Sequence, residues 1–219
     1  TVQYKYMPIR FATNDEVARW DNLIASNPDG GNVFQSYEIA TVKQQSGWKP
    51  RFLVAGNLAI TVHERRVPGL GCLWYIPKGP GLTDVSAIKG LLPELRSFAR
   101  ANRAFAVKIE PEFINSEAVN ASLKKLGLVK VRPIQPNSST VILDLSKPLS
   151  DIMAGLNQKG RHAIHRAERD GVTAKAVPFT AKNCKTMYNL LRQTAEGQWN
   201  TRSYNYYQAF WESFASKGQ

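Results

Sequence analysis

Positive side chains gather within one short stretch of the sequence, QKGRHAIHRAER at residues 158–169. Ile164 and Ala167 in this stretch have the spacing of one face of a helix. Ammonium and guanidinium groups at this density can contact successive nucleic-acid phosphates, with an affinity that falls as salt rises. The alternative is a solvated amphipathic helix, for which such charge is common. The four cations concerned are Lys159, Arg161, Arg166 and Arg169.

Two further cations are candidates for binding phosphate. Arg202 precedes a cluster of tyrosines that includes Tyr206, and its guanidinium fork suits a diphosphate. Lys43 falls near the carboxyl end of a predicted helix, where an ammonium could neutralise a phosphate as a point charge. The alternatives are a solvated loop arginine for Arg202 and an exposed lysine stabilising a helix end for Lys43.

Glu110 and Lys78 are the remaining candidates. Glu110 ends an apolar strand and precedes Pro111, where an acid has no obvious packing role. It could accept a hydrogen bond from a substrate or act as a base, or it could pair with Lys108 or Lys78. Lys78 lies in a Pro-Lys-Gly-Pro-Gly stretch that predicts a rigid turn.

The first two thirds of the chain alternate between strands and helices. Strands are predicted at 6–12, 51–55, 58–65, 71–76, 104–110, 128–132 and 140–145, with turns at 56–57 and 68–69. Helices are predicted to begin at Asn14, to span 36–45, to follow the apolar stripe at 88–99, and to begin at Asn115. Pro93 should kink the third of these helices or mark its start. The order is β-α-α-β-β-β-α-β-α-β-β.

Beyond residue 146 the order of elements begins again. Ser150 is predicted to cap a helix, the basic helix should end at Gly171, and a strand is expected at 172–177. Helices follow from Thr180 and over 204–215. The last helix is rich in aromatic residues that nothing else in the sequence is expected to cover. We therefore predict two units, 1–146 and 147–219, the second of them incomplete.

Composition narrows the classes of partner. Lys and Arg number 29 against 17 acidic residues, a net charge of +12, which suggests an anionic partner or simply a basic surface. Cys72 and Cys184 cannot form a disulfide framework and suit a reducing compartment. No signal peptide or membrane-spanning run is evident, so a cytoplasmic location is expected. His162 and His165 lack a nearby third ligand, so a metal site is not expected.

Several stretches together resemble the Fem family. Its pattern of an Asp-Leu-Ser strand end followed by K-x-R-x-x-I-x-x-A-x-x-x-G-V corresponds to Asp144–Ser146 and then 159–172. Residues 34–48 resemble its Q-S/T-x-x-W-x-x-x-K…W stretch, with Ile39 where an aromatic residue is common. Residues 75–80, 109–112 and 201–207 resemble its Y-x-P/S-R/K-G-P, R-x-D/E-P and R-x-x-x-Y-Y/F motifs, with Lys108 in place of the arginine. Each piece is short, but their order and distances are specific in combination.

The resemblance implies an α/β (α+β) fold of two tandem GNAT-like units, each a mixed sheet with flanking helices. The order of elements found above is also that of the GNAT (N-acetyltransferase) fold, an analogy of topology alone. The implied activity moves an amino acid from aminoacyl-tRNA to the stem peptide of a peptidoglycan precursor. That precursor would be a UDP-MurNAc-peptide or a lipid-linked muropeptide, and the protein could associate peripherally with the inner membrane face.

The resemblance also implies roles for single residues. Lys43, Arg202 and Tyr206 would bind the precursor's diphosphate, with Glu110 and Lys78 also facing the substrate. The cations at 159, 161, 166 and 169 would contact tRNA. No cofactor is implied, because an aminoacyl ester is already activated and an amine can attack it directly. Catalytic residues are expected beyond Gln219, so residues 1–219 alone should be inactive.

Two other classes of protein remain as alternatives. A basic RNA-binding module without catalysis would explain the charge, but the aromatic residues have mostly core spacing and no RNA-binding signature occurs. A CoA-dependent N-acyltransferase would need the Q/R-x-x-G-x-G/A pyrophosphate loop, which is missing near Lys78.

Overall fold

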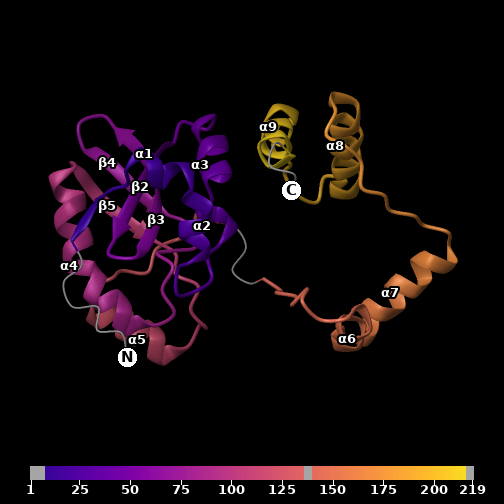
Figure 1. Ribbon diagram of the computed structural model, residues 1–219, viewed down its shortest axis with the longest axis horizontal. Helices are drawn as coiled ribbons and strands as arrows, with labels where there is room; N and C mark the ends of the chain where they lie inside the picture. Colours follow the sequence, from indigo (N-terminus) through magenta and orange to yellow (C-terminus); the bar gives the residue numbers. More distant parts are fainter. Residues whose placement is uncertain (1–7, 136–139, 216–219) are drawn as a thin grey trace.

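A five-stranded mixed sheet forms the centre of the computed structural model, which describes residues 8–135 and 140–215 (Figure 1). The strands lie in the order β1 (Ile9–Phe11), β2 (Lys49–Ala55), β3 (Leu58–Val67), β4 (Gly71–Ile76) and β5 (Ala104–Ile109). The first four pair antiparallel, and β5 runs parallel to β4. The sequence predicted all five strands and the turns between β2, β3 and β4.

Helices cover both faces of the sheet because side chains alternate along each strand. From β3, Ile60 and Val62 join the main core with α4 (Val85–Ala101), whereas Ala59 packs with Trp20 on the other face. Figure 1 shows α4 on one side of the sheet and α2 and α3 on the other. Asp84 caps α4 by accepting the Ala87 N–H at 2.9 Å. The helix is continuous through Pro93, so the predicted start at this proline is wrong.

The helical segment after β1 differs from the prediction. Two short helices, α1 (Asn14–Ala18) and α2 (Trp20–Ala25), meet at Arg19, which has a non-helical conformation. Thr13, not Asn14, is the cap, because its hydroxyl and the Glu16 carboxylate form a capping box. A single 3₁₀ turn, η1 (Val33–Gln35), then leads to α3 (Tyr37–Gln44), which Ser36 caps close to the predicted bounds.

Two predicted strands that would extend the sheet are absent from the described residues. After α5 (Glu117–Lys125), which Ser116 caps in place of Asn115, residues 128–132 and 140–144 have no strand hydrogen bonding. Val141 and Ile142 are 86% and 87% exposed. Their sequence suits a strand, but strand preference depends on packing against neighbours, and these side chains have none.

The basic segment forms a pair of helices set apart from the sheet (Figure 1). They are α6 (Leu149–Gly155) and α7 (Gln158–Arg169), and Gly171 ends the second with φ +72°, as predicted. Pro148 occupies the cap position of α6, so the predicted Ser150 cap is wrong. Residues 172–177, predicted as a strand, are irregular and largely exposed, without a neighbouring strand.

After this segment the chain returns to α3. Thr180 caps α8 (Ala181–Ala195) by accepting the Asn183 N–H at 3.1 Å, and α9 is Tyr204–Ala215, both as predicted. The helices α8 and α9 pack on each other, and α9 also packs against α3. Thus α3 covers part of the aromatic face for which the sequence offered no partner.

Within 8–135 and 140–215, no helix has the combination of length and apolar character that is needed to cross a bilayer.

Candidate anion-binding site

Two cations from distant parts of the sequence meet where α9 packs against α3. Lys43 belongs to the last turn of α3, and Arg202 precedes the first turn of α9. Both lie near the ring of Tyr206: the Lys43 Nζ is 6.0 Å from the ring centroid, and the Arg202 Cζ is 4.9 Å from it. Cations attract the face of an aromatic ring at such distances, so Tyr206 holds both side chains in one place.

The electrostatics of this cluster favour an anion. Burial, followed by the nearby Arg202 charge, lowers the pKa of Lys43 from its ordinary value. Burial raises the pKa of Tyr206, while Arg202 opposes that rise. Two like charges in a partly desolvated site repel each other, and an anion bound between them would attract both and offset that repulsion.

A hollow of about 330 Å³ adjoins the cluster. It opens between the end of α3 and the start of α9, and its walls carry hydroxyl, amide and guanidinium groups. Small-molecule sites in proteins begin at about this size. The lining residues are Gln45, Ser46, Arg202, Ser203, Asn205 and Tyr206.

A buried aromatic group lies behind Lys43 on the same face of the sheet. His63 of β3 is directly opposite Tyr75 of β4, with ring centroids 6.2 Å apart, and the Trp48 ring is also 6.2 Å from that of His63. Burial, then the Lys43 charge, lowers the pKa of His63 to about 4. His63 is therefore neutral at physiological pH. Arg65 lies over the Trp48 ring at 4.3 Å.

Glu110 occupies a second polar cluster, at the end of β5. Its carboxylate accepts hydrogen bonds from the Tyr75 hydroxyl and from the Ile134 N–H, the latter at 2.9 Å, and it pairs with Lys108 at 3.6 Å. Lys108 also donates to the Arg132 carbonyl. Burial, followed by this bond to Glu110, raises the pKa of Tyr75. In this structure Glu110 therefore attaches the segment after α5 to β5, the structural alternative that the sequence left open.

Lys78 lies in a third place, in the turn after β4. Its ammonium pairs with Glu112 at 3.5 Å, and its backbone has φ +49°. Gln35 fixes this turn from η1 by donating to the Pro77 carbonyl and accepting the Thr61 N–H at 2.8 Å. Gly81 is required nearby, because a Cβ there would lie 2.4 Å from the Asn27 amide nitrogen. These contacts explain physically why the motifs at 34–36 and 75–80 occur together.

The four cations of α7 share one helix but not one environment. Arg161 donates to the carbonyls of Ala154 and Leu156, the first at 3.3 Å, so it satisfies the end of α6. Arg166 pairs with Asp170 at 3.5 Å, with both side chains more than half exposed. Lys159 and Arg169 are also exposed. The helix thus presents cations to solvent at three of the four predicted positions, while Arg161 joins α7 to the end of α6.

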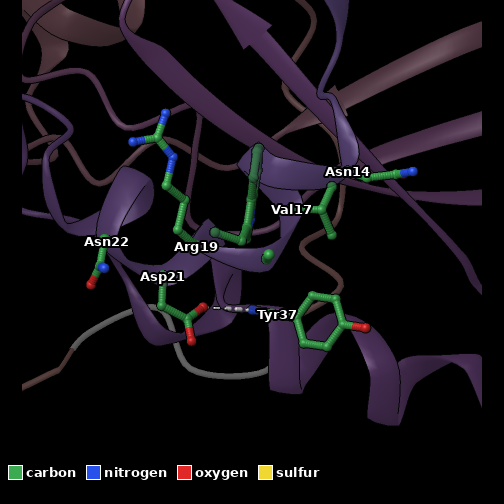
Figure 2. A pocket seen from close by; sticks show the side chains of 8 residues that line it. Asn14, Val17, Arg19, Asp21, Asn22 and Tyr37 are labelled. Carbon is green, nitrogen blue, oxygen red and sulfur yellow. Dashed lines mark hydrogen bonds between the residues drawn. The ribbon is translucent and has the colours of Figure 1, made fainter.

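Another cavity, of about 750 Å³, lies between the α1–α2 corner and the start of α3 (Figure 2). Figure 2 shows Asp21 pointing to Tyr37, whose N–H it accepts at 2.8 Å. Tyr37 stacks on Phe52, with ring centroids 5.7 Å apart. These contacts fix the first turn of α3 against the α1–α2 corner. The residues that line this cavity differ from those of the Lys43–Arg202 cluster.

Among the residues that the structure places, no three His, Cys, Asp or Glu side chains gather as metal ligands would.

His63 and Trp48 are the site residues that the sequence reasoning did not find. His63 lies in an alternating strand, where a histidine next to a glutamate looks like a solvated position. Only the β3–β4 register, which sets it opposite Tyr75, reveals that it faces inward. Tyr75 and Trp48 lay within motifs that the sequence singled out, but no role was predicted for them.

The fold and the sequence comparisons agree on the class of protein. The architecture is a GNAT-like mixed α/β fold, and the structure is similar to a crystal structure of FemX. That similarity has a TM-score of 0.70 at 21% identity and covers 97% of this chain and 56% of the other. The sequence matches the FemAB family over residues 13–126, more than half of its 219 residues. The chain belongs to the FemAB family.

Two relatives are named for a glycine transfer reaction. The chain is 24% identical over 217 residues to a lipid II:glycine glycyltransferase of Staphylococcus aureus strain MRSA252. It is 23% identical over 224 residues to the enzyme of the same name from Staphylococcus haemolyticus strain JCSC1435. Each match covers 90% of this chain and 51% of the relative. The chain thus spans about half the length of these relatives.

Proposed function

We propose that this chain is the precursor-binding part of an aminoacyltransferase that extends the stem peptide of a peptidoglycan precursor. The relatives named for glycine transfer to lipid II support this class of reaction. We further propose that residues 1–146 form one GNAT-like unit and that 147–219 begin a second. The sheet and its cores lie within 8–135, while α8 and α9 come later in the chain, after α6 and α7.

The observation that carries the proposal is the convergence of Lys43 and Arg202 on Tyr206. The two cations come from the two proposed units, and together they suit the diphosphate that links a sugar to its nucleotide or lipid carrier. The lysine supplies a compact charge, and the arginine supplies a fork that can bind two phosphate oxygens at once.

The donor in this proposal is aminoacyl-tRNA. The acceptor amine attacks the ester carbon, an amide bond forms, the ester bond breaks, and the tRNA hydroxyl leaves as the amine loses a proton. Exposed cations on α7, namely Lys159, Arg166 and Arg169, are our candidates for contact with tRNA phosphates. We assign the reacting site to the portion of the relatives that this chain does not span, so residues 1–219 should bind the precursor without turnover.

The test compares precursor binding by the 219-residue chain and by its Lys43→Ala and Arg202→Ala variants. Each substitution should weaken binding of a UDP-linked muropeptide by about 10- to 150-fold, since a hydrogen bond to a charged group contributes roughly 1.5–3 kcal/mol. Lys89→Ala, an exposed lysine on α4, is the control and should bind as the wild type does. Unchanged precursor binding with weakened tRNA binding would instead place both residues on a nucleic-acid surface.

A further inference from the structure

His63 is buried in a way that hydrophobic packing does not explain. Its side chain is 1% exposed, and neither ring nitrogen has a hydrogen-bond partner among the described residues. A neutral imidazole carries one donor and one acceptor, and burying either of them unpaired is unfavourable. An apolar side chain of similar size would avoid that cost. A buried histidine at this position therefore points to a hydrogen bond that forms only when a ligand binds nearby.

The groups around His63 limit what that partner can be. The Tyr75 and Trp48 rings enclose it, with centroids 6.2 Å away in each case. The Tyr75 hydroxyl is already committed to Glu110. Lys43 from α3 is the charged group that acts on His63, with Arg202 beyond it and Arg65 over the Trp48 ring, and α3 also carries the buried side chain of Glu38.

Lys43 supplies the missing donor. Its ammonium has three N–H groups, and burial between α3 and α9 removes much of the water that would accept from them. An anion bound between Lys43 and Arg202 would accept some of these hydrogens, on the side of the ammonium that faces Arg202. A carboxylate behind Lys43 would satisfy the remaining donor but would also cancel the charge that attracts the anion. A neutral imidazole satisfies the donor and leaves the charge intact.

We propose that His63 is a positioning residue for Lys43, accepting a hydrogen bond from its ammonium when an anion binds at the α3–α9 junction. The proposal rests on the proposed function only in so far as that junction binds a diphosphate. His63 does not touch the anion. It orients the lysine that does.

The experiment uses inorganic pyrophosphate as the probe and the 219-residue chain, with calorimetric titration and urea unfolding measured on the same samples. His63→Leu should weaken pyrophosphate binding roughly tenfold, the effect of one hydrogen bond to a charged group. Its unfolding midpoint should be at or above that of the wild type, because an unpaired buried polar group is removed. His63→Gln, which keeps an acceptor, should bind within about threefold of the wild type. His162→Leu on exposed α7 is the matched control and should bind normally.

A second measurement separates positioning from packing. The ¹⁵N shifts of the His63 ring should change at one nitrogen on adding pyrophosphate, as that nitrogen becomes an acceptor. Unchanged ring shifts, or wild-type binding by His63→Leu, would overturn the inference. In that case, loss of binding in Lys43→Ala would leave the proposed function standing. If the wild type does not bind pyrophosphate at all, the proposed function and this inference both fail.

Discussion

Lys43 and Arg202 contribute differently to one anion site. Lysine is a flexible point charge, whereas arginine presents a planar fork whose donors are fixed relative to one another. Arg202 also lies closer to the Tyr206 ring, at 4.9 Å against 6.0 Å for Lys43. The Tyr206 ring therefore restrains the Arg202 guanidinium more than the Lys43 ammonium. The affinity for an anion should depend on this geometry as well as on charge.

Substitutions at these two positions should reveal their coupling. We expect Arg202→Lys to recover little of the pyrophosphate affinity that Arg202→Ala loses, because one ammonium cannot reproduce the fork. The Lys43→Ala, Arg202→Ala double variant should lose less binding free energy than the two single losses added together, since both residues contact one ligand group. Calorimetric titration of the wild type and these four variants measures both effects. Full additivity would indicate two separate anion sites.

His63 should also make stability depend on pH. Its folded-state pKa is about 4, against an ordinary value of 6.5, so between these values the unfolded chain binds more protons than the folded one. Protonation of His63 therefore does not lower the free energy of unfolding above pH 6.5, but lowers it increasingly as the pH falls toward 4. The loss should reach about 3 kcal/mol of unfolding free energy.

Urea unfolding between pH 4.5 and 7.5 tests this dependence. The free energy of unfolding of His63→Leu should decline less on acidification than that of the wild type. Parallel curves for the wild type and His63→Leu would show that the His63 ring titrates normally in the fold.

At the scale of elements, Gln35 connects η1 with β3 and with the turn after β4. Its side chain bonds both the N–H and the carbonyl of Thr61 in β3 and the carbonyl of Pro77 after β4, while its own carbonyl accepts the Trp20 indole N–H at 3.1 Å. It therefore aligns η1, β3 and the turn that carries Lys78.

Removing this side chain should both destabilise the fold and loosen the turn. Gln35→Ala leaves buried backbone groups of Thr61 and Pro77 without partners, which should cost about 2–4 kcal/mol of unfolding free energy. Gln44→Ala, at an exposed position on α3, should change it by less than about 0.5 kcal/mol. Chemical denaturation gives both values. A small change in the free energy of unfolding of Gln35→Ala would mean that water satisfies the Thr61 and Pro77 backbone groups as well as the amide does.

Substitutions of the α7 cations should have two different effects, one on the stability of α6 and one on tRNA binding. Arg161→Ala removes the donor to the Ala154 and Leu156 carbonyls and should increase amide exchange in α6. Arg169→Ala should leave that exchange unchanged.

Under the proposed function, substitutions of Lys159, Arg166 and Arg169 should weaken tRNA binding and reduce its salt dependence by about one counterion each. Equal effects of all four substitutions on α6 exchange would contradict this division.

The elements also show where sequence reasoning succeeds and where it cannot. β2, β3 and β4, α9, and the Thr180 cap of α8 follow from local alternation, spacing and turn chemistry, so the sequence predicted them closely. The segments 128–132 and 140–145 have the same strand-forming composition but no partner beside them, and pairing is not encoded locally. For the same reason the residues alone gave Lys43 and Arg202 as separate candidates, and only the resemblance to the Fem family assigned them to one diphosphate. The burial of His63 depends on the β3–β4 register and was missed.

At the scale of the molecule, the anion cluster joins α9 to the sheet-bearing unit. The connection between them through the chain is long and includes α6 and α7, which stand apart from the sheet (Figure 1). The contact between α3 and α9 is therefore held by side chains, among them Lys43, Arg202 and Tyr206. Two of these are like charges, so the contact includes a repulsive interaction until an anion is present.

An anion should consequently tighten the attachment of α9. We expect pyrophosphate to slow amide exchange in α9 and in the last turn of α3 of the 219-residue chain, while the amides of β2 and β3 at the centre of the sheet are unaffected. The effect should saturate with the pyrophosphate binding curve, because binding to the closed arrangement shifts the population toward it. In Lys43→Ala it should be much reduced, while Lys89→Ala should respond as the wild type does. Slower exchange throughout the protein would indicate general stabilisation by the salt. No change in α9 on saturation would show that the anion binds to one unit alone and that Lys43 and Arg202 do not share it.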